Sequence, residues 1–246
     1  MGRWAKNQHA SLSAYGLLPH PTPAIVNIYL GLLDPRLAVA AMAIERVPFE
    51  LFPEEEAFVL DAVEKRCREF SSGRVLARRA MAELGVPPAA IPRGNDRLPI
   101  WPLGLIGSIA HTDSYCAAAI GRREDGLRSV GLDLEPAEPL PSDLLDRVTL
   151  SEERAWLASF NDVERGIYAR ALFSAKECAF KCQYPLTRTM LDFHDFAVVL
   201  DREQERFTAT LRRDAPPFEN GSVFHGRFRI GADLIACAMS IAEEDV

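Results

Sequence analysis

The stretch Val130-Gly-Leu-Asp-Leu-Glu135 decides how the rest of this sequence is interpreted. Its apolar residues alternate with Gly131, Asp133 and Glu135, which is the two-residue period of a strand with one apolar face. The two carboxylates stand two positions apart, so both side chains leave the same face, and Pro136 ends the hydrogen bonding of the strand. Neighbouring like charges repel unless a cation, a proton or solvent intervenes. The pattern therefore predicts either a solvated polar face or a cation site.

Size and composition are those of an ordinary globular protein. The 246 residues can bury a sizeable core in one domain or two, and 48% of them are hydrophobic while 26% are charged. A net charge of −7 argues against general nucleic-acid affinity. No apolar run has the length of a membrane span, no secretory signal is visible, and the five scattered cysteines fit a reducing compartment. We therefore expect a cytoplasmic protein that binds neither nucleic acid nor membrane.

The chain before this strand predicts a loose arm, a strand and two helices. Residues 1–24 are polar and proline-rich, and the apolar run Ile25–Leu33 is typical of a strand. A helix is expected from Pro53, where three glutamates follow in a first turn that favours negative charge. A second helix is expected from just after Gly73 to about Leu84.

Strands and helices are then expected to recur in the same order. Gly107–Thr112 and Tyr115–Gly121 predict a hairpin with His111 at a strand end, and the strand 128–135 follows. A helix over Val163–Gln183 comes next. The remainder predicts four strands, over Phe196–Asp201, Phe207–Leu211, Val223–Ile230 and Leu234–Ala242. Helices followed by antiparallel strands in each half predict an α+β fold of two similar lobes, residues 1–127 and 128–246, each a small mainly antiparallel sheet packed with helices.

A basic segment and a charged helix carry the remaining signals. Asp61–Ala80 has six positive residues against three negative ones, which indicates either a solvated helix face or a site for an anion such as phosphate. In Phe173–Lys181, Glu177 and Lys181 stand four residues apart and Lys176 lies beside Glu177. This is either a favourable surface pair or part of a site. With the two strand carboxylates, Glu177 makes three oxygen donors of the kind that Mg²⁺ binds.

These segments resemble, in order and spacing, the Sfp-type 4′-phosphopantetheinyl transferases, most closely the enterobactin-synthase branch. The matching segments are Arg66–Gly85, Ile100-Trp-Pro102, Gly107–Thr112, Gly131–Glu135, Phe173–Glu177 with Lys181, and Leu191–Asp195. The resemblance implies a monomer with pseudo-twofold symmetry whose two lobes hold coenzyme A. It also implies transfer of the 4′-phosphopantetheine group to a serine of an apo acyl or peptidyl carrier protein, with release of adenosine 3′,5′-bisphosphate. The carriers served by this family belong to fatty-acid, polyketide, nonribosomal peptide and siderophore synthesis.

The same resemblance implies roles for individual residues. Mg²⁺, or Mn²⁺ in its place, would be held by Asp133, Glu135 and Glu177 and by the pyrophosphate of coenzyme A. Glu152 is the best match to a glutamate that serves as base in some members, with Glu153 beside it and Glu177 as a competing base. The side chains expected to hold coenzyme A are Arg66, Arg74 and Arg93 at the 3′-phosphate and adenine end, His111 at a phosphate oxygen, and Lys176 and Lys181 at the pyrophosphate and pantetheine side. Lys181 would also act in catalysis by offsetting charge on the leaving phosphate.

Two rival functions and one departure from the family pattern stay open at this point. A metal-dependent nuclease can also combine strand acids with a helix Glu and Lys, although no basic stripe suits a nucleic acid. A non-catalytic module that binds coenzyme A or a carrier protein is the second rival. Ala110 stands where the family usually has Ser or Thr before the histidine, which removes a possible hydroxyl contact to coenzyme A.

Overall fold

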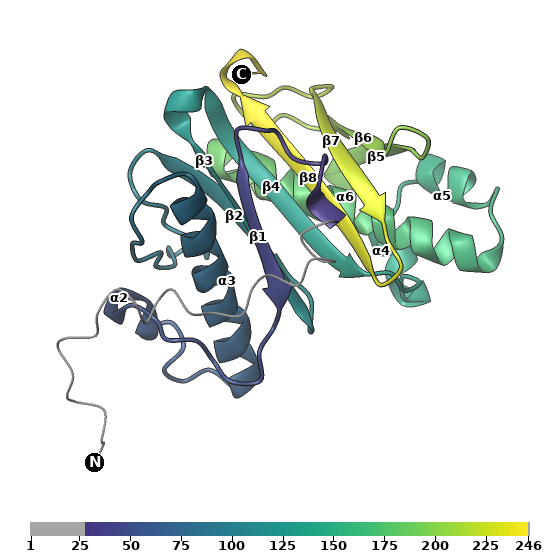
Figure 1. Ribbon diagram of the computed structural model, residues 1–246. Coiled ribbons are helices and arrows are strands. Elements are labelled where there is room, and N and C mark those ends of the chain that lie inside the picture. Colours follow the sequence, from purple (N-terminus) through teal and green to yellow (C-terminus); the bar gives the residue numbers. More distant parts are fainter. Residues whose placement is uncertain (1–27, 246) are drawn as a thin grey trace.

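The computed structural model describes residues 28–245, which form two antiparallel sheets flanked by helices (Figure 1). The first sheet has three strands in the order β1-β3-β2, and the second has five in the order β4-β8-β7-β6-β5. The strands are β1 Ala38–Ala43, β2 Leu105–His111, β3 Tyr115–Arg122, β4 Leu127–Pro136, β5 Phe196–Asp201, β6 Arg206–Leu211, β7 Val223–Ile230 and β8 Leu234–Ala242. The predicted α+β class with two mainly antiparallel sheets is confirmed, while the pseudo-twofold relation between the lobes stays a prediction.

Two long helices cover one face of each sheet. Helix α3 (Glu64–Glu83) packs its buried residues on the three-stranded sheet, and α6 (Asp162–Thr187) packs on the five-stranded sheet and passes behind it in Figure 1. A third apolar cluster joins the two sheets to each other. The shorter helices are α2 Pro53–Glu56, α4 Leu145–Val148, α5 Ser151–Leu157 and the 3₁₀ turns Arg123–Asp125, Ser142–Leu144, Phe193–Asp195 and Glu243–Asp245.

The predicted elements of the second half and the hairpin are confirmed. β2 and β3 pair antiparallel, with His111 at the end of β2. The four strands after α6 lie within a residue or two of their predicted bounds. In β5 to β7 the buried residues alternate with more open ones, which leaves the two-residue period visible in the sequence, whereas β3 and β8 are buried on both faces and appear as short runs of small apolar residues.

The strand predicted over Ile25–Leu33 is wrong for the part that the structure describes. Ile28 and Tyr29 form a helical turn that continues into turns, and the first strand is β1. Ile28, Tyr29 and Leu32 are buried together between the sheets, which is a helical spacing. A short apolar run does not by itself separate a strand from a buried helical turn. The predicted arm, residues 1–24, lies outside the described residues.

The two predicted helices of the first half are also misplaced. The helix that begins at Pro53 ends at Glu56, and the long helix α3 begins at Glu64, so it passes through Gly73 without a break. A Cβ built on Gly73 would lie 2.8 Å from Ile109 Cγ2 on β2. Glycine here allows close packing of α3 on the sheet and does not mark a turn. The predicted end of this helix near Leu84 is confirmed, since Gly85 adopts φ +70°.

The division into lobes at residues 127 and 128 stays a proposal. It is supported by the sheets, since β1 to β3 form one and β4 to β8 form the other. Within residues 28–245 no helix combines the length and the apolar character needed to cross a membrane.

Candidate active site

The strand β4 is covered on both faces, so the solvated polar face considered for it is wrong. Leu132 and Leu134 lie in the cluster between the sheets, and Asp133, whose side chain meets α6, is only 4% exposed. Ser108 Oγ of β2 accepts a hydrogen bond from Leu132 N at 3.0 Å, which ties the two sheets together at this point. Asp133 is therefore a buried carboxylate that needs a positive partner.

Gly131 brings β4 and α6 close enough for their side chains to meet. A Cβ built on Gly131 would lie 2.2 Å from the carbonyl oxygen of Cys178 and 2.9 Å from the main-chain nitrogen of Cys182. Two residues further along β4, Asp133 Oδ1 accepts a hydrogen bond from Lys181 Nζ at 2.6 Å. The spacing of glycine and aspartate on one face of the strand thus sets the contact between strand acid and helix lysine.

We expect Gly131→Ala to separate these elements. The clash involves helix backbone, which does not move aside as a flexible side chain does, so the free energy of unfolding should fall by about 1–3 kcal/mol or more. Urea denaturation of the variant measures this, with Gly231→Ala as the control, since the tightest contact of its Cβ is 3.3 Å. A stability equal to that of the unchanged protein would contradict the close approach of β4 and α6.

The three predicted carboxylates lie in one electrostatic environment, and two of them have basic partners. Glu135 Oε2 accepts from Arg170 Nη1 at 2.9 Å; burial raises the pKa of Glu135 to about 7, with Asp133 adding to the effect and Arg170 opposing it. Burial also raises the pKa of Glu177, while Lys181 lowers it and Asp133 raises it. Each of these carboxylates would gain from a further positive charge.

The chemistry of these oxygen donors suits a divalent cation, although their present positions do not form a complete site. Asp133 Oδ2 is buried and has no hydrogen-bond partner, so one oxygen of the strand acid stays available. Among residues 28–245, no three His, Cys, Asp or Glu side chains are gathered closely enough to hold an ion as they stand. Lys181 and Arg170 hold two of the three carboxylates. Mg²⁺ prefers oxygen ligands, and the unpaired Oδ2 of Asp133 is a buried oxygen that could bind it.

The first lobe brings a histidine and an arginine to the same place. Arg66 Nη1 lies 3.5 Å from His111 Nε2, and Glu69 lies beside both. Burial lowers the pKa of His111; Glu69 raises it, and the charges of Arg66 and Lys181 lower it further. His111 at the end of β2 and Lys181 on α6 are therefore close enough to interact across the lobes. The positive charges of Arg66 and Lys181, with the His111 imidazole between them as a hydrogen-bonding group, make this region suited to an anion.

Arg74 lies near Arg66, whose guanidinium is 6.0 Å from the centre of the Phe70 ring that Arg74 also contacts, and Arg93 lies over the neighbouring ring of Phe58. Arg74 is buried under the edge of α3, where its Nε donates to the carbonyl of Ile91 at 2.8 Å and its guanidinium lies 3.9 Å from the centre of the Phe70 ring. Burial lowers the pKa of Arg74 to about 10. Arg93 lies over the ring of Phe58 at 5.5 Å. Within residues 28–245, neither arginine forms a hydrogen bond or ion pair with His111 or Lys181.

Lys176 and the two glutamates at the start of α5 differ from expectation. Lys176 is 1% exposed, and its Nζ donates to Glu153 and to the carbonyls of Val148 and Phe193 at 2.8 to 2.9 Å. Glu153 is buried and also accepts from the main-chain nitrogens of Leu150 and Val198. Its neighbour Glu152 is exposed and pairs with Arg212. Lys176 Nζ is thus engaged in a buried network that fastens α5 and β5 to α6, and its predicted contact with coenzyme A stays a proposal.

Comparison with known proteins accounts for this set of residues. A model of the 4′-phosphopantetheinyl transferase N-terminal domain matches residues 54–121, and one of the 4′-phosphopantetheinyl transferase superfamily matches residues 129–237. The 4′-phosphopantetheinyl transferase Svp of Streptomyces mobaraensis is 39% identical over 220 residues, which cover 87% of this chain and 89% of Svp. This chain belongs to the 4′-phosphopantetheinyl transferases.

Two further relatives cover smaller parts of the transferase. The 4′-phosphopantetheinyl transferase PptT of Mycobacterium tuberculosis is 40% identical over 201 residues, 76% of this chain and 84% of PptT. Enterobactin synthase component D of Salmonella typhi is 35% identical over 120 residues, 48% of each chain. The predicted family, in its Sfp-type and enterobactin-synthase-like branch, is confirmed. The protein is a transferase enzyme of this type, and the family acts on carrier proteins with coenzyme A.

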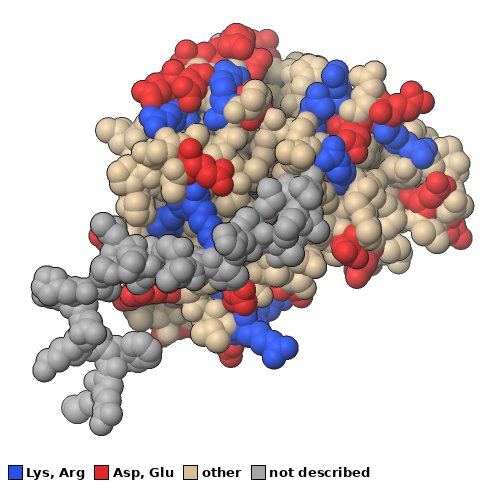
Figure 2. Space-filling view, viewed as in Figure 1, with Lys and Arg blue, Asp and Glu red and all other residues tan. Residues whose placement is uncertain are grey.

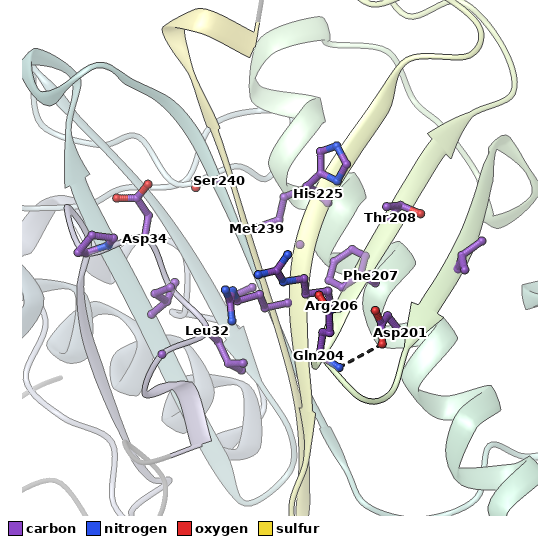
Figure 3. A pocket seen from close by; sticks show the side chains of 17 residues that line it. Leu32, Asp34, Asp201, Gln204, Arg206, Phe207, Thr208, His225, Met239 and Ser240 are labelled. Atoms are coloured by element: carbon purple, nitrogen blue, oxygen red, sulfur yellow. Dashed lines mark hydrogen bonds between the residues drawn. The ribbon is translucent and has the colours of Figure 1, made fainter.

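Cavities of this transferase are lined by residues of the proposed site. One of about 580 Å³ lies between the loop 96–104 with β2 and the end of α6, and Lys181 lines it. Another of about 800 Å³ is lined by His111, Glu135 and Arg170. A third groove, of about 630 Å³, is lined by residues of β5 to β8 and by the segment 31–35 (Figure 3). It shares no residue with the proposed site. The candidates for coenzyme A are the first two cavities and a cavity of about 380 Å³ that Lys176, Glu177 and Phe180 line.

Sequence reasoning missed Glu153 and Arg170 and left Ala110 uncertain. Glu153 occupies the third position of α5, where a glutamate bonds back to the nitrogen before the helix, and that position was its available signal. Arg170 gave no local signal, because its partner is 35 residues away. Ala110 is 1% exposed in the cluster between the sheets, so its side chain does not face the cleft beside His111.

Proposed function

We propose that this transferase moves the 4′-phosphopantetheine group of coenzyme A to a serine hydroxyl of an apo acyl or peptidyl carrier protein with the help of Mg²⁺ or Mn²⁺, and that adenosine 3′,5′-bisphosphate leaves. The observation that carries the metal requirement is the buried Asp133 carboxylate, of which Oδ1 is paired with Lys181 and Oδ2 is unpaired. Bound at Asp133, Glu135 and Glu177, the cation supplies charge neutralisation at the pyrophosphate.

The remaining residues are proposed to bind, orient and neutralise. Lys181 offsets charge on the leaving phosphate, and His111 with Arg66 binds phosphate oxygens from the first lobe. Arg74 and Arg93 stay proposed contacts of the 3′-phosphate and adenine end. Lys176 is also proposed to position Glu177, because its hydrogen bond to Glu153 holds the helix turn that carries Glu177. Positioning and electrostatic stabilisation suffice for a phosphoryl-type transfer, which demands little covalent chemistry of the protein.

The charges on the visible face of the protein give no support to a nucleic acid as the substrate. On the face seen in Figure 2, the described acidic and basic residues are interspersed, and no continuous basic stripe crosses them. The proposed partners are carrier proteins of polyketide, nonribosomal peptide, siderophore or fatty-acid synthesis. We further propose a monomer in the cytoplasm, a location that the five free cysteines support.

Intact-mass spectrometry of apo carrier proteins tests the function directly. Incubation of each carrier with this protein, coenzyme A and Mg²⁺ should add one phosphopantetheine mass to the carrier, and a chelator should abolish the gain. Carriers are then ranked by initial rate. A gain that persists in excess chelator would remove the metal from the proposal, and no gain on any carrier, with coenzyme A still bound by calorimetry, would remove the transfer.

Glu152 and Glu177 are the two candidate bases, and paired variants separate them. Burial raises the pKa of Glu177, whereas the pKa of the exposed Glu152 is lowered by main-chain and Ser151 hydrogen bonds and by Arg212. We expect Glu177→Gln to lower kcat by about a hundredfold or more and Glu152→Gln to change it little. Steady-state kinetics on one carrier measures both, and a Mn²⁺ titration of Glu177→Gln separates the loss of a base from the loss of a metal ligand. A comparable loss of kcat in Glu152→Gln would indicate that Glu152, on α5, is the base.

A further inference from the structure

Tyr29, which lies outside the residues matched by both family models, contacts the proposed metal ligand Asp133 from the side opposite to α6. Tyr29 is 1% exposed in the cluster between the two sheets, where it packs with Leu132 and Leu134 of β4. Its hydroxyl donates a hydrogen bond to the carbonyl oxygen of Asp133 at 3.0 Å. Burial raises the pKa of Tyr29 well above its usual value, with a smaller contribution from Asp133, so the hydroxyl keeps its proton. Asp133 is thereby fixed from the side opposite to α6.

The segment around Tyr29 is held by an arginine of the second sheet. We call residues 28–35 the N-terminal strap. Arg229 Nη1 on β7 donates to the carbonyl of Leu30 at 2.9 Å and to that of Ile28 at 3.3 Å, on either side of Tyr29. Glu205 accepts from Arg229 Nη2 at 2.6 Å and from its Nε at 3.1 Å, which orients the guanidinium.

The strap also borders the groove on the far face of the five-stranded sheet. In Figure 3, Leu32 and Asp34 of the strap lie across this groove from Phe207 and Thr208 of β6. Bonds from β7 at one end and burial at the other leave the Tyr29 ring little freedom. A rigid donor is what a positioning hydrogen bond requires.

The direction of the Asp133 side chain depends on the peptide that Tyr29 holds. Its Oδ1 is paired with Lys181, so the orientation of the backbone decides where the unpaired, buried Oδ2 points. Loss of the tyrosine hydroxyl would leave the carbonyl of Asp133 with one partner fewer in a buried site and would loosen that peptide.

We propose that Tyr29 is a positioning residue, which aims the carboxylate of Asp133 at the cation through its hydrogen bond to the Asp133 carbonyl. The inference rests on the proposed metal role of Asp133. It extends the site to the N-terminal strap, which carries no residue of the predicted motifs.

The test measures metal binding separately from activity. The full chain is titrated with Mn²⁺ alone, by calorimetry or electron paramagnetic resonance, in the unchanged protein and in Tyr29→Phe. We expect the Mn²⁺ dissociation constant to rise about tenfold, the size of one lost buried hydrogen bond. In transfer assays kcat should fall by a similar factor at fixed metal, rise again with added metal, and leave the KM for coenzyme A unchanged.

Tyr168→Phe is the matched control, because it removes the same hydroxyl from a half-buried tyrosine of α6 whose ring packs against Trp156 and Phe160. It should bind Mn²⁺ as the unchanged protein does. If Tyr29→Phe does not fold, Arg229→Gln loosens the strap and leaves the tyrosine in place, and it should weaken Mn²⁺ binding in the same direction.

Asp133→Asn separates the two possible failures. If Asp133→Asn loses Mn²⁺ while the folded Tyr29→Phe, or Arg229→Gln in its place, binds it like the unchanged protein, the role of Tyr29 is overturned and the proposed function stands. If Asp133→Asn binds Mn²⁺ normally, the metal role of Asp133 fails, and the inference fails with it.

Discussion

Asp133→Asn is expected to lower kcat for phosphopantetheine transfer by about a thousandfold or more while coenzyme A still binds. Asparagine keeps the shape of the side chain but removes the negative charge that pairs with Lys181 at 2.6 Å and would hold the cation. The Lys181 side chain is partly exposed, and without its ion pair to Asp133 it could bind the phosphates of coenzyme A directly. The affinity for coenzyme A should therefore be largely retained. Carrier modification measured by intact mass, with coenzyme A affinity by calorimetry, checks both parts.

Asp143→Asn is the matched control for this variant, since Asp143 is exposed in the 3₁₀ turn Ser142–Leu144 away from α6. It should transfer at the unchanged rate. A kcat for Asp133→Asn within about tenfold of the unchanged protein would contradict a catalytic cation at this carboxylate, because such an ion contributes several kcal/mol.

Lys176→Met is expected to lower the free energy of unfolding by about 3–5 kcal/mol, the cost of leaving one member of a buried ion pair without its partner. Both side chains of the Lys176 and Glu153 pair are almost completely buried, and Lys176 Nζ gives up three hydrogen bonds when it is removed. Urea denaturation followed by circular dichroism measures the change. Activity at low temperature, where the variant is folded, should fall less than in Asp133→Asn.

The double variant Lys176→Met with Glu153→Gln is the decisive comparison. Because it removes both charges, it should be less destabilised than the sum of the single variants. Glu152→Gln, one residue along α5, serves as the exposed control and should leave the denaturation midpoint where it was. Equal stability of Lys176→Met and the unchanged protein would contradict a structural role, and strictly additive losses would contradict the coupling of the pair.

Most of the second half of the fold could be predicted from local pattern. Each of the strands β5 to β7 faces α6 on one side and is more open on the other, so burial follows the two-residue alternation. The first half was harder to predict because some of its small residues are required by contacts with residues far away in the sequence. Gly73 is interior to α3 on account of Ile109, which lies 36 positions later in the chain. From the sequence alone, a glycine that allows close packing cannot be distinguished from one that forms a turn.

The residues of the proposed site were named from sequence, whereas their contacts with one another could not be predicted. Two short motifs contain Asp133, Glu135, Glu177 and Lys181, and their spacing places these residues on one strand face and one helix turn. The resemblance to the family, and the phosphopantetheine transfer expected from it, rested largely on these motifs. Only the tertiary structure decided that Lys176 and Glu153 are buried partners, that Arg170 pairs with Glu135, and that Tyr29 lies behind Asp133. The physical reason is that backbone periodicity is a local property, whereas the burial and pairing of a charge depend on residues brought together from distant parts of the chain.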